Sequence, residues 1–267
     1  MKRELISPEN SLGRIFFGLC IAAPLFIFAV IAKIIILPFE RPQKITATQV
    51  VLHLYEFIEG FGGDYDWDEF TSVPIANQQL ESIRVRANQV KLPFDEEGLA
   101  ALHLLLTEAK SLSEKEVLDN DCPVKNVEYL QLNPLTSIVD FAPQKPFAAV
   151  VIITTTVTSE WREQVSKWLV DEGCLCMMAW GDECSLWDDS VDIYNLEANG
   201  WNEIPDDKSV VTTWHENEPL SDVFWNASQS NFHPPNTQLE HLLILDIADR
   251  AREEKIRNLF ALSCNKI

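Results

Sequence analysis

The chain has 267 residues, of which 46% are hydrophobic and 23% charged, and this composition is typical of a globular protein rather than a disordered one. Its formal net charge of -20 argues against a nucleic-acid partner and against a body lying on anionic lipid, because both need a basic surface. The charge is compatible with a basic protein partner, or it serves only to keep the protein soluble.

An apolar segment near the N-terminus extends from Ile15 to Phe39. As a helix, its 25 residues would be about 37 Å long, which exceeds a hydrocarbon core of about 30 Å. Pro24 within the segment and Lys33 near its end are both tolerated by membrane helices. The segment therefore predicts a single-pass anchor in the lipid bilayer, preceded by a short tail of residues 1–14.

Two alternatives to a permanent anchor stay open. Val30, Ile31 and Ala32 could form the cleavage site of a signal peptide. Cys20 could carry a lipid, although Leu19 before it is larger than a lipoprotein motif prefers. Basic residues flank both sides of the segment and do not decide its orientation. The five cysteines outside it are an odd number, which favours a reducing, cytoplasmic compartment for the body.

Residues 46–119 are predicted to form a small helical region. The three expected helices have apolar faces formed by Val50, Val51, Leu54, Tyr55 and Ile58, by Leu80, Ile83 and Ala87, and by Leu99, Leu102, Leu106 and Ala109. Gly60 ends the first helix, and Pro93 separates the other two. Residues 120–146 contain four prolines and are predicted to be an irregular linker.

Residues 147–267 alternate between strand and helix patterns. The predicted strands are Phe147 to Thr155, Cys174 to Ala179, Val210 to Thr213 and Leu242 to Asp246. The predicted helices are Ser159 to Glu172, Leu186 to Ala198, Leu220 to Ser228 and Ala248 to Leu262. This order predicts an α/β domain with a four-stranded, mainly parallel, Rossmann-like sheet and flanking helices.

Ligands of such sheets bind beyond the carboxyl ends of the strands. The candidate catalytic residues at these ends are Asp182, His215 and Asp246, and the candidate cofactor-binding residues are Thr155, Asp182 and Asp246. In the alternative interpretation, Asp246 only caps the last helix and His215 begins a surface loop. No phosphate-binding, dinucleotide, nucleophile-elbow or zinc-protease motif is present, so no particular cofactor is indicated.

The sequence predicts no metal site. Asp64, Asp66 and Asp68 begin like a calcium loop, but Glu69 replaces the required glycine and Ile75 stands in place of the bidentate glutamate. A polar loop that caps the next helix is the expected structure there.

Two further patterns have structural interpretations. Asp188, Asp189 and Asp192 are expected in the first turns of a helix, where the macrodipole favours acids, with Trp187 anchored in the core. Cys174, Cys176 and Cys184 lack the close pairs of zinc sites. The first two are expected on one strand face, buried as small hydrophobic residues.

Two segments resemble an uncharacterised bacterial α/β family of unknown function. The residues that carry the resemblance are Trp180, Gly181, Cys184, Trp187, Asp188, Asp189, Val191 and Asp192, then Thr212, Thr213, Trp214, His215, Glu216, Pro219 and Leu220. The segment from Trp67 to Ile75, with Leu80, Glu81, Ile83 and Arg84, is similar to segments of uncharacterised bacterial proteins. The resemblance implies a bacterial origin and an α/β fold, and no activity.

Two functions are compatible with these features. The first is a membrane-anchored, non-catalytic interaction protein, for example an immunity or inhibitor protein that holds a basic partner. The second is an enzyme, or a nucleotide or metal sensor, with its site at the carboxyl ends of the strands. The charge, the anchor and the missing motifs favour the first.

Overall fold

The computed structural model of the chain describes residues 42–114, 126–134, 141–229 and 239–264. Within it, Lys44–Ile267 forms one compact unit, separate from Met1–Gln43. The predicted membrane anchor, residues 15–39, lies outside the described residues. Among the helices in the described ranges, none is long and apolar enough to cross a membrane.

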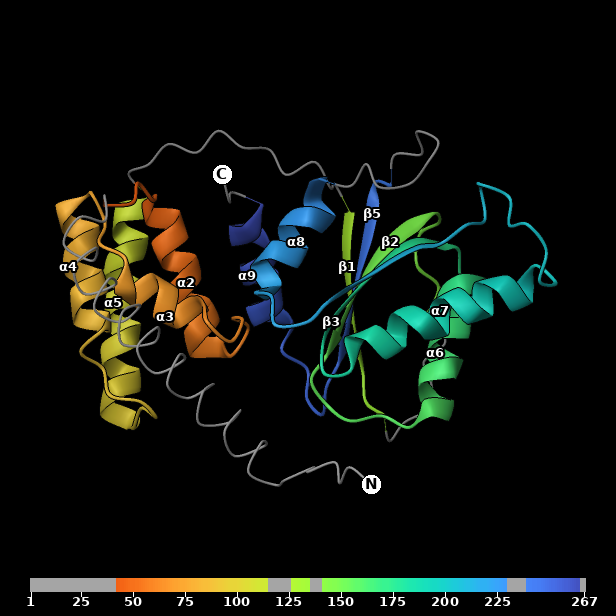
Figure 1. The fold of residues 1–267 in the computed structure, drawn as a ribbon, viewed down its shortest axis with the longest axis horizontal. Helices are drawn as coiled ribbons and strands as arrows, with labels where there is room; N and C mark the ends of the chain where they lie inside the picture. Colours follow the sequence, from red (N-terminus) through yellow and green to blue (C-terminus); the bar gives the residue numbers. More distant parts are fainter. Residues whose placement is uncertain (1–41, 115–125, 135–140, 230–238, 265–267) are drawn as a thin grey trace, which may run out of the picture. The chain divides into compact units, whose positions relative to one another are not determined.

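A parallel sheet lies at the centre of the unit (Figure 1). Its five strands are β1 (Asn126–Leu132), β2 (Phe147–Ile153), β3 (Cys174–Gly181), β4 (Val211–His215) and β5 (His241–Ile247), in the order β1-β5-β2-β3-β4. All the neighbouring strands pair in parallel. The predicted parallel α/β sheet is confirmed, but the strand count of four was wrong. Strand β1 lies within residues 120–146, which were predicted to be an irregular linker.

Strand β2 shows why the centre of the sheet was predictable. All seven of its residues are buried, because helices cover both faces of the strand and leave no position for a polar side chain. At its start the pairing with β3 is irregular, since Phe147 pairs with Cys174 and Ala148 with Cys176. This irregularity places Cys174 and Cys176 in the cores on opposite sheet faces, not on one face as predicted. Their burial is confirmed, and it raises the pKa of the Cys176 thiol to about 12.

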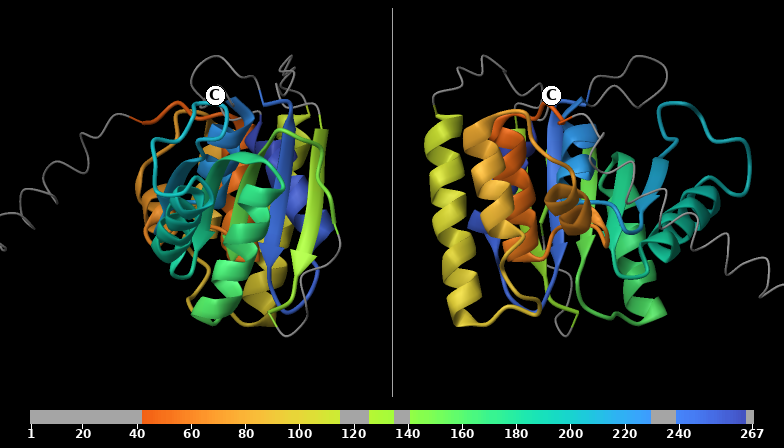
Figure 2. Two further views of the ribbon diagram at one scale, coloured as in Figure 1. Left: turned by 90° about the vertical axis from the view of Figure 1, so that its right-hand side faces the viewer. Right: turned by 60° about the vertical axis from the view of Figure 1, so that its left-hand side comes forward.

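Two pairs of helices cover the sheet (Figures 1 and 2). Helices α6 (Ser159–Asp171) and α7 (Cys184–Ala198) pack on one face, where Val165, Leu169 and Trp187 join the strand residues in one core. Helices α8 (Leu220–Gln229) and α9 (Glu253–Ser263) pack on the opposite face. Four helices were predicted in this part of the chain and four are observed, although α9 begins five residues later than expected.

The remaining helices of the described residues lie beyond α8 and α9 and form the helical region. They are α2 (Ala47–Glu59), α3 (Asp66–Ser72), α4 (Gln78–Ala87) and α5 (Glu96–Ser113). Thr46 caps α2, because its side chain accepts from the Gln49 N–H while the Gln49 side chain accepts from the Thr46 N–H. Helix α3 was not predicted, because a polar loop was expected at these residues. Asp66, Asp68 and Glu69 occupy its first turn.

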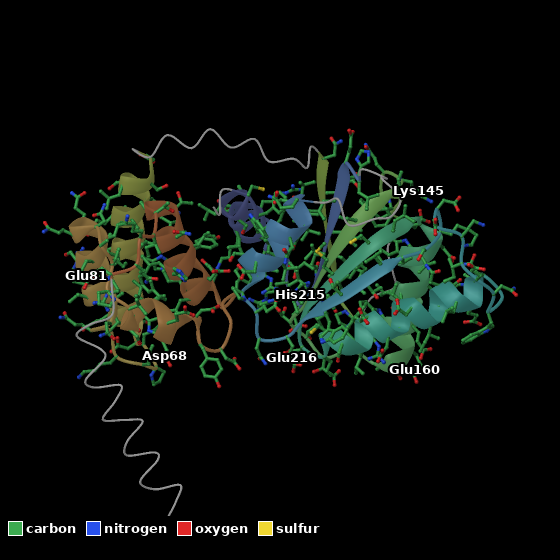
Figure 3. The ribbon with its side chains drawn as sticks, turned by 45° about the horizontal axis from the view of Figure 1, so that its top comes forward. Asp68, Glu81, Lys145, Glu160, His215 and Glu216 are labelled. Carbon is green, nitrogen blue, oxygen red and sulfur yellow. The ribbon has the colours of Figure 1, made fainter. Side chains whose placement is uncertain are left out.

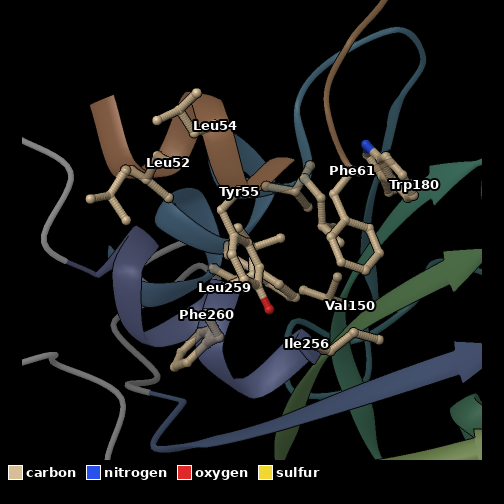
Figure 4. Close-up of a cluster of buried hydrophobic side chains, with 14 of the residues drawn as sticks. Leu52, Leu54, Tyr55, Phe61, Val150, Trp180, Ile256, Leu259 and Phe260 are labelled. Carbon is tan, nitrogen blue, oxygen red and sulfur yellow. The ribbon is translucent and has the colours of Figure 1, made fainter. Parts of the chain in front are cut away.

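Helix α2 joins the helical region to the rest of the unit. The Tyr55 hydroxyl donates to the Lys255 carbonyl oxygen at 3.0 Å, and Lys255 Nζ lies 2.5 Å from Glu59 Oε2. Figure 4 shows Tyr55 and Phe61 beside Leu259 and Val150, within a hydrophobic cluster that continues from α2 to the sheet. The helical region and one face of the sheet therefore share a single core.

Candidate functional site

The carboxyl ends of β2 and β5 form the switch point of the sheet. From β2 the chain continues into α6 on one face, and from the adjacent β5 it continues into α9 on the other face. In open α/β sheets, ligands bind in the crevice where such connections diverge. Asp246 and Thr154 lie at this position, so the structure places one of the predicted site residues there.

Asp246 is the buried centre of a hydrogen-bond network whose other members are partly exposed. Its side chain is fully buried and accepts from the Tyr129 hydroxyl at 2.8 Å and from Arg252 Nη2 at 2.9 Å. The same Arg252 nitrogen donates to Thr154 Oγ1 at 2.9 Å. Burial raises the pKa of the Tyr129 hydroxyl above its ordinary value, so this hydroxyl stays protonated and remains a donor. The interpretation that Asp246 caps α9 is wrong, because α9 begins only at Glu253.

The network places several of the protein's own side chains at the switch point. The Arg252 guanidinium also lies over the ring of Phe61, with 5.2 Å between Cζ and the ring centroid. Phe61 in turn contacts Trp180 edge-on, with 6.5 Å between the ring centroids. A cation that would otherwise attract an anionic ligand is thus neutralised by Asp246 and covered by an aromatic ring. The arrangement favours a structural role for Asp246 over a ligand-binding one.

His215 belongs to a separate cluster at the end of β4 (Figure 3). Its Nδ1 lies 2.8 Å from Glu218 Oε2, and its Nε2 lies 3.1 Å from Thr213 Oγ1. The sequence singled out His215 but missed Thr213 and Glu218. The signal for Thr213 was available, because side chains two residues apart on a strand point to the same face. The interpretation that His215 begins a surface loop is wrong, since it is the last residue of the strand.

The candidate catalytic residues do not form one constellation. His215 pairs with Trp180, Trp180 with Ile152, and Ile152 with Asp246, so two strands separate His215 from Asp246. At about 4.8 Å between strands, their backbones are about 14 Å apart, which is too far for direct hydrogen-bond cooperation.

Asp182 and Thr155 lie in the turns that follow β3 and β2. Asp182 is exposed, and its N–H donates to the Ile153 carbonyl oxygen at 2.9 Å. Gly181 before it has φ +100°, and a Cβ there would clash with the same carbonyl oxygen, so glycine is required at this turn. Thr155 is half-buried. The structure thus gives the Asp182 backbone a role in the turn.

A groove lies between α6 and α7, on the sheet face opposite the helical region. Its volume is about 710 Å³. Four carboxylates line it, together with two cationic and several apolar or neutral side chains; the lining residues are Glu160, Arg162, Glu163, Gln164, Lys167, Leu186, Asp189, Ser190, Ile193, Tyr194 and Glu197. Figure 3 shows Glu160 near the start of α6. This groove was not predicted from the sequence, because its residues come from two helices whose spacing depends on the sheet beneath them.

Charge and apolar surface occur together in the groove. Lys167 Nζ lies 2.7 Å from Tyr194 Oη and 3.8 Å from Asp171 Oδ2, so its charge is already balanced by an aspartate outside the lining. Ile193 is 54% exposed and Leu186 is 38% exposed, so the groove also presents apolar surface to a partner. Arg162 Nε and Ser190 Oγ are buried atoms with no hydrogen-bond partner among the residues that the structure describes. The groove is thus acidic, partly apolar, and has unused hydrogen-bonding capacity.

Helix α7 also carries a buried carboxylate. The helix begins at Cys184, so Asp188 lies in its second turn. The predicted position in the first turns of a helix is confirmed, but the macrodipole acts mainly on the first turn and gives this acid little stabilisation. Asp188 is only 8% exposed, and within the described ranges its Oδ1 atom has no hydrogen-bond partner. Burial raises the pKa of Asp188, although a hydrogen bond from Thr212 opposes the shift. Trp187, in contrast, is fully buried in the core, as predicted.

Asp188→Asn is expected to stabilise the protein at neutral pH. A raised pKa in the folded state means that folding favours the protonated acid, so this contribution to stability is lost as the pH rises through the folded-state pKa. The neutral amide avoids that loss. Thermal unfolding of both proteins should show a higher midpoint for the variant at pH 7 and no difference at about pH 3, below the unfolded-state pKa. A variant that is less stable than the wild type at pH 7 would contradict the expectation, and Asp207→Asn is the exposed control.

The Asp66 carboxylate, which lies in the calcium-like pattern, has a structural role in a turn. Asp66 Oδ2 accepts from the Gly63 N–H at 2.5 Å, so this side chain stabilises the turn that leads into α3. In the parts of the chain that the structure describes, no group of three or more His, Cys, Asp or Glu residues is arranged to hold a metal ion.

The match to a protein family includes the sheet and its flanking helices. The model of a domain of unknown function, DUF7684, matches residues 127–263, which is just over half of the chain. The match starts in β1, about 20 residues before the predicted start of the α/β domain, and ends at the last residue of α9. The chain matches no curated protein and no solved structure. The expected membership of an uncharacterised family is therefore confirmed, and the chain belongs to the DUF7684 family.

Proposed function

We propose that the protein is an interaction module, anchored in the membrane by residues 15–39, that binds a basic amphipathic helix of a partner protein in the α6–α7 groove. The single observation that supports this proposal most strongly is the composition of the groove. Glu160, Glu163, Asp189 and Glu197 contribute four carboxylates to a concave surface that also exposes Leu186 and Ile193.

The chemistry of the groove matches one class of partner. Lysine and arginine side chains on one face of a helix pair with the carboxylates, while leucine-like side chains on its other face cover Leu186 and Ile193. The net charge of -20 adds long-range attraction for a basic partner. An acidic or uncharged helix of the same shape would gain neither the pairing with the carboxylates nor the long-range attraction. The groove therefore discriminates between partners by charge as well as by shape.

A charge reversal in the groove is expected to weaken binding of such a helix by about tenfold or more. The variant is Glu163→Lys with Asp189→Lys. The probe is a labelled synthetic helix with lysines on one face and leucines on the other, and binding to the full chain is measured by fluorescence anisotropy at low and high salt. A peptide with glutamate in place of lysine serves as the ligand control.

The matched protein control is Glu96→Lys with Glu97→Lys. Both residues are exposed in the first turn of α5, in the helical region, and the change in net charge is the same. If the two variants weaken binding equally, the attraction comes from net charge alone and the groove is not the binding site. Unchanged affinity in the groove variant would also overturn the proposal.

A further inference from the structure

Three side chains on and after β4 form a line of hydrogen bonds from a hydroxyl to a carboxylate. Thr213 Oγ1 lies 3.1 Å from His215 Nε2, and His215 Nδ1 lies 2.8 Å from Glu218 Oε2. Thr213 and His215 share one face of the strand, and the turn at Asn217, whose φ is +60°, brings Glu218 back to the ring. None of the three residues lines the α6–α7 groove.

The protons in this line can be assigned from the chemistry of its members. An ionised Glu218 only accepts hydrogen bonds, so His215 Nδ1 must carry the proton that it donates to the carboxylate. In the neutral imidazole, Nε2 is then the unprotonated nitrogen and an acceptor, and the Thr213 hydroxyl donates to it. A hydroxyl that donates to an imidazole, itself oriented by a carboxylate, is the arrangement that activates a nucleophile.

The neighbouring residues hold the His215 ring in place and leave the Thr213 hydroxyl accessible to solvent. The His215 side chain is only 12% exposed, whereas Thr213 is exposed to solvent. The Glu218 segment is fixed by Trp180, whose indole N–H donates to the Glu218 carbonyl oxygen at 2.7 Å. Strand β4 is also the last strand in the order of the described sheet, so its outer backbone N–H groups have no strand partner there. Such groups can stabilise an oxyanion that forms beside the strand.

We propose that Thr213 is the nucleophile of an acyl-transfer site that cleaves carboxylic esters, with His215 as general base and Glu218 as a positioning residue. Thr213 Oγ1 attacks the ester carbonyl carbon while His215 Nε2 takes the hydroxyl proton. The bond from the carbonyl carbon to the alcohol oxygen then breaks, and His215 returns the proton to the departing alcohol. Water attacks the acyl-threonine with His215 again as base, which releases the acid and restores the Thr213 hydroxyl.

The site is tested with the full chain and p-nitrophenyl acetate. The expected result is release of p-nitrophenol together with an acetyl group on Thr213, located by peptide mass spectrometry. Thr213→Val and His215→Gln should each lower the rate of nitrophenol release by about 100-fold or more, and Thr213→Ser should retain it. An acetyl group found only on lysines, or acetylation of Thr213 at an unchanged rate in His215→Gln, would overturn the assignment.

The role of Glu218 needs a readout that a merely structural residue would not change. In Glu218→Gln the amide no longer fixes the proton on Nδ1, so we expect a slower reaction and a displaced pH profile, with partial rescue in Glu218→Asp. A pH profile identical to that of the wild type would remove Glu218 from the site. Because these residues lie outside the groove, the test is independent of helix binding, and either proposal can fail without the other.

Discussion

Arg252→Ala is expected to lower the free energy of unfolding by about 3 kcal/mol, the lower end of the range for breaking a buried ion pair. The lower end applies because the Arg252 side chain is 23% exposed, whereas the Asp246 side chain is fully buried. Without the guanidinium, Asp246 would keep only the Tyr129 hydroxyl as a side-chain partner among the contacts described above. Urea unfolding of the purified chain, followed by far-UV circular dichroism, measures the change.

The double variant Arg252→Ala with Asp246→Asn separates the ion pair from simple packing. The neutral amide removes the unpaired buried charge and can still accept from Tyr129, so part of the lost stability should return. If the double variant is no more stable than Arg252→Ala, the loss comes from the contacts of Arg252 with Phe61 and Thr154 rather than from the unpaired carboxylate.

The Arg252–Asp246 ion pair also helps to decide between the interaction protein and the ligand-binding or catalytic protein that the sequence suggested. A ligand at the switch point would have to displace Arg252 from Asp246, Thr154 and Phe61, and this displacement costs the interactions that the first prediction measures. If Arg252→Ala lowers the free energy of unfolding only slightly, the switch point again becomes a candidate binding site. A large loss of stability supports a function at the exposed surfaces of the domain rather than at its central crevice.

The parts of the fold that could be predicted from the sequence are those with a strong local pattern. The run from Phe147 to Thr155 was predicted as a buried strand, and β2 occupies Phe147–Ile153. The amphipathic stretch from Ser159 to Glu172 corresponds to α6, and its N-cap is Thr158, whose hydroxyl accepts from the Trp161 N–H. In each case the spacing of apolar residues within one short segment indicates whether one face or both faces of the element are buried.

Strand β1 was missed because an edge strand has a weak pattern. Its residues are mostly half-buried, and prolines 123 and 134 flank it, so the segment resembled a loop. The alternation of Val127 and Tyr129, whose side chains pack on the helical side of the sheet, was the available signal. The partner of Tyr129 could not be inferred, because Asp246 is distant in sequence and becomes a neighbour only through the strand order.

The candidate site shows the same limit of local reasoning. His215 was singled out as a strand-end residue, and the structure surrounds it with Thr213 and Glu218, both within three residues of it in sequence. Its grouping with Asp246 failed, because the sequence fixes the order of strands along the chain but not their order in the sheet. The α6–α7 groove could not be foreseen for the same reason, since it depends on which helices lie side by side.

Phe61→Ala is expected to lower the free energy of unfolding by about 4 kcal/mol, typical of a buried phenylalanine. Phe61 is only 1% exposed and packs against Trp180 from β3 and Arg252 from the start of α9. Its carbonyl oxygen also accepts from the Leu220 N–H of α8 at 2.9 Å. The residue thus connects the segment after α2 to the sheet and to both helices on that face, and its loss should destabilise all of them together.

Hydrogen exchange measured by mass spectrometry distinguishes a shared core from two independent ones. If the helical region and the sheet unfold as one cooperative unit, protection of α2 and of β2 should fall by the same free energy in Phe61→Ala. Phe61→Leu is the matched control, and it should cost less because it retains most of the buried apolar volume. A loss of protection confined to α2 would show that the helical region unfolds on its own, and that the core it shares with the sheet contributes little to their cooperativity.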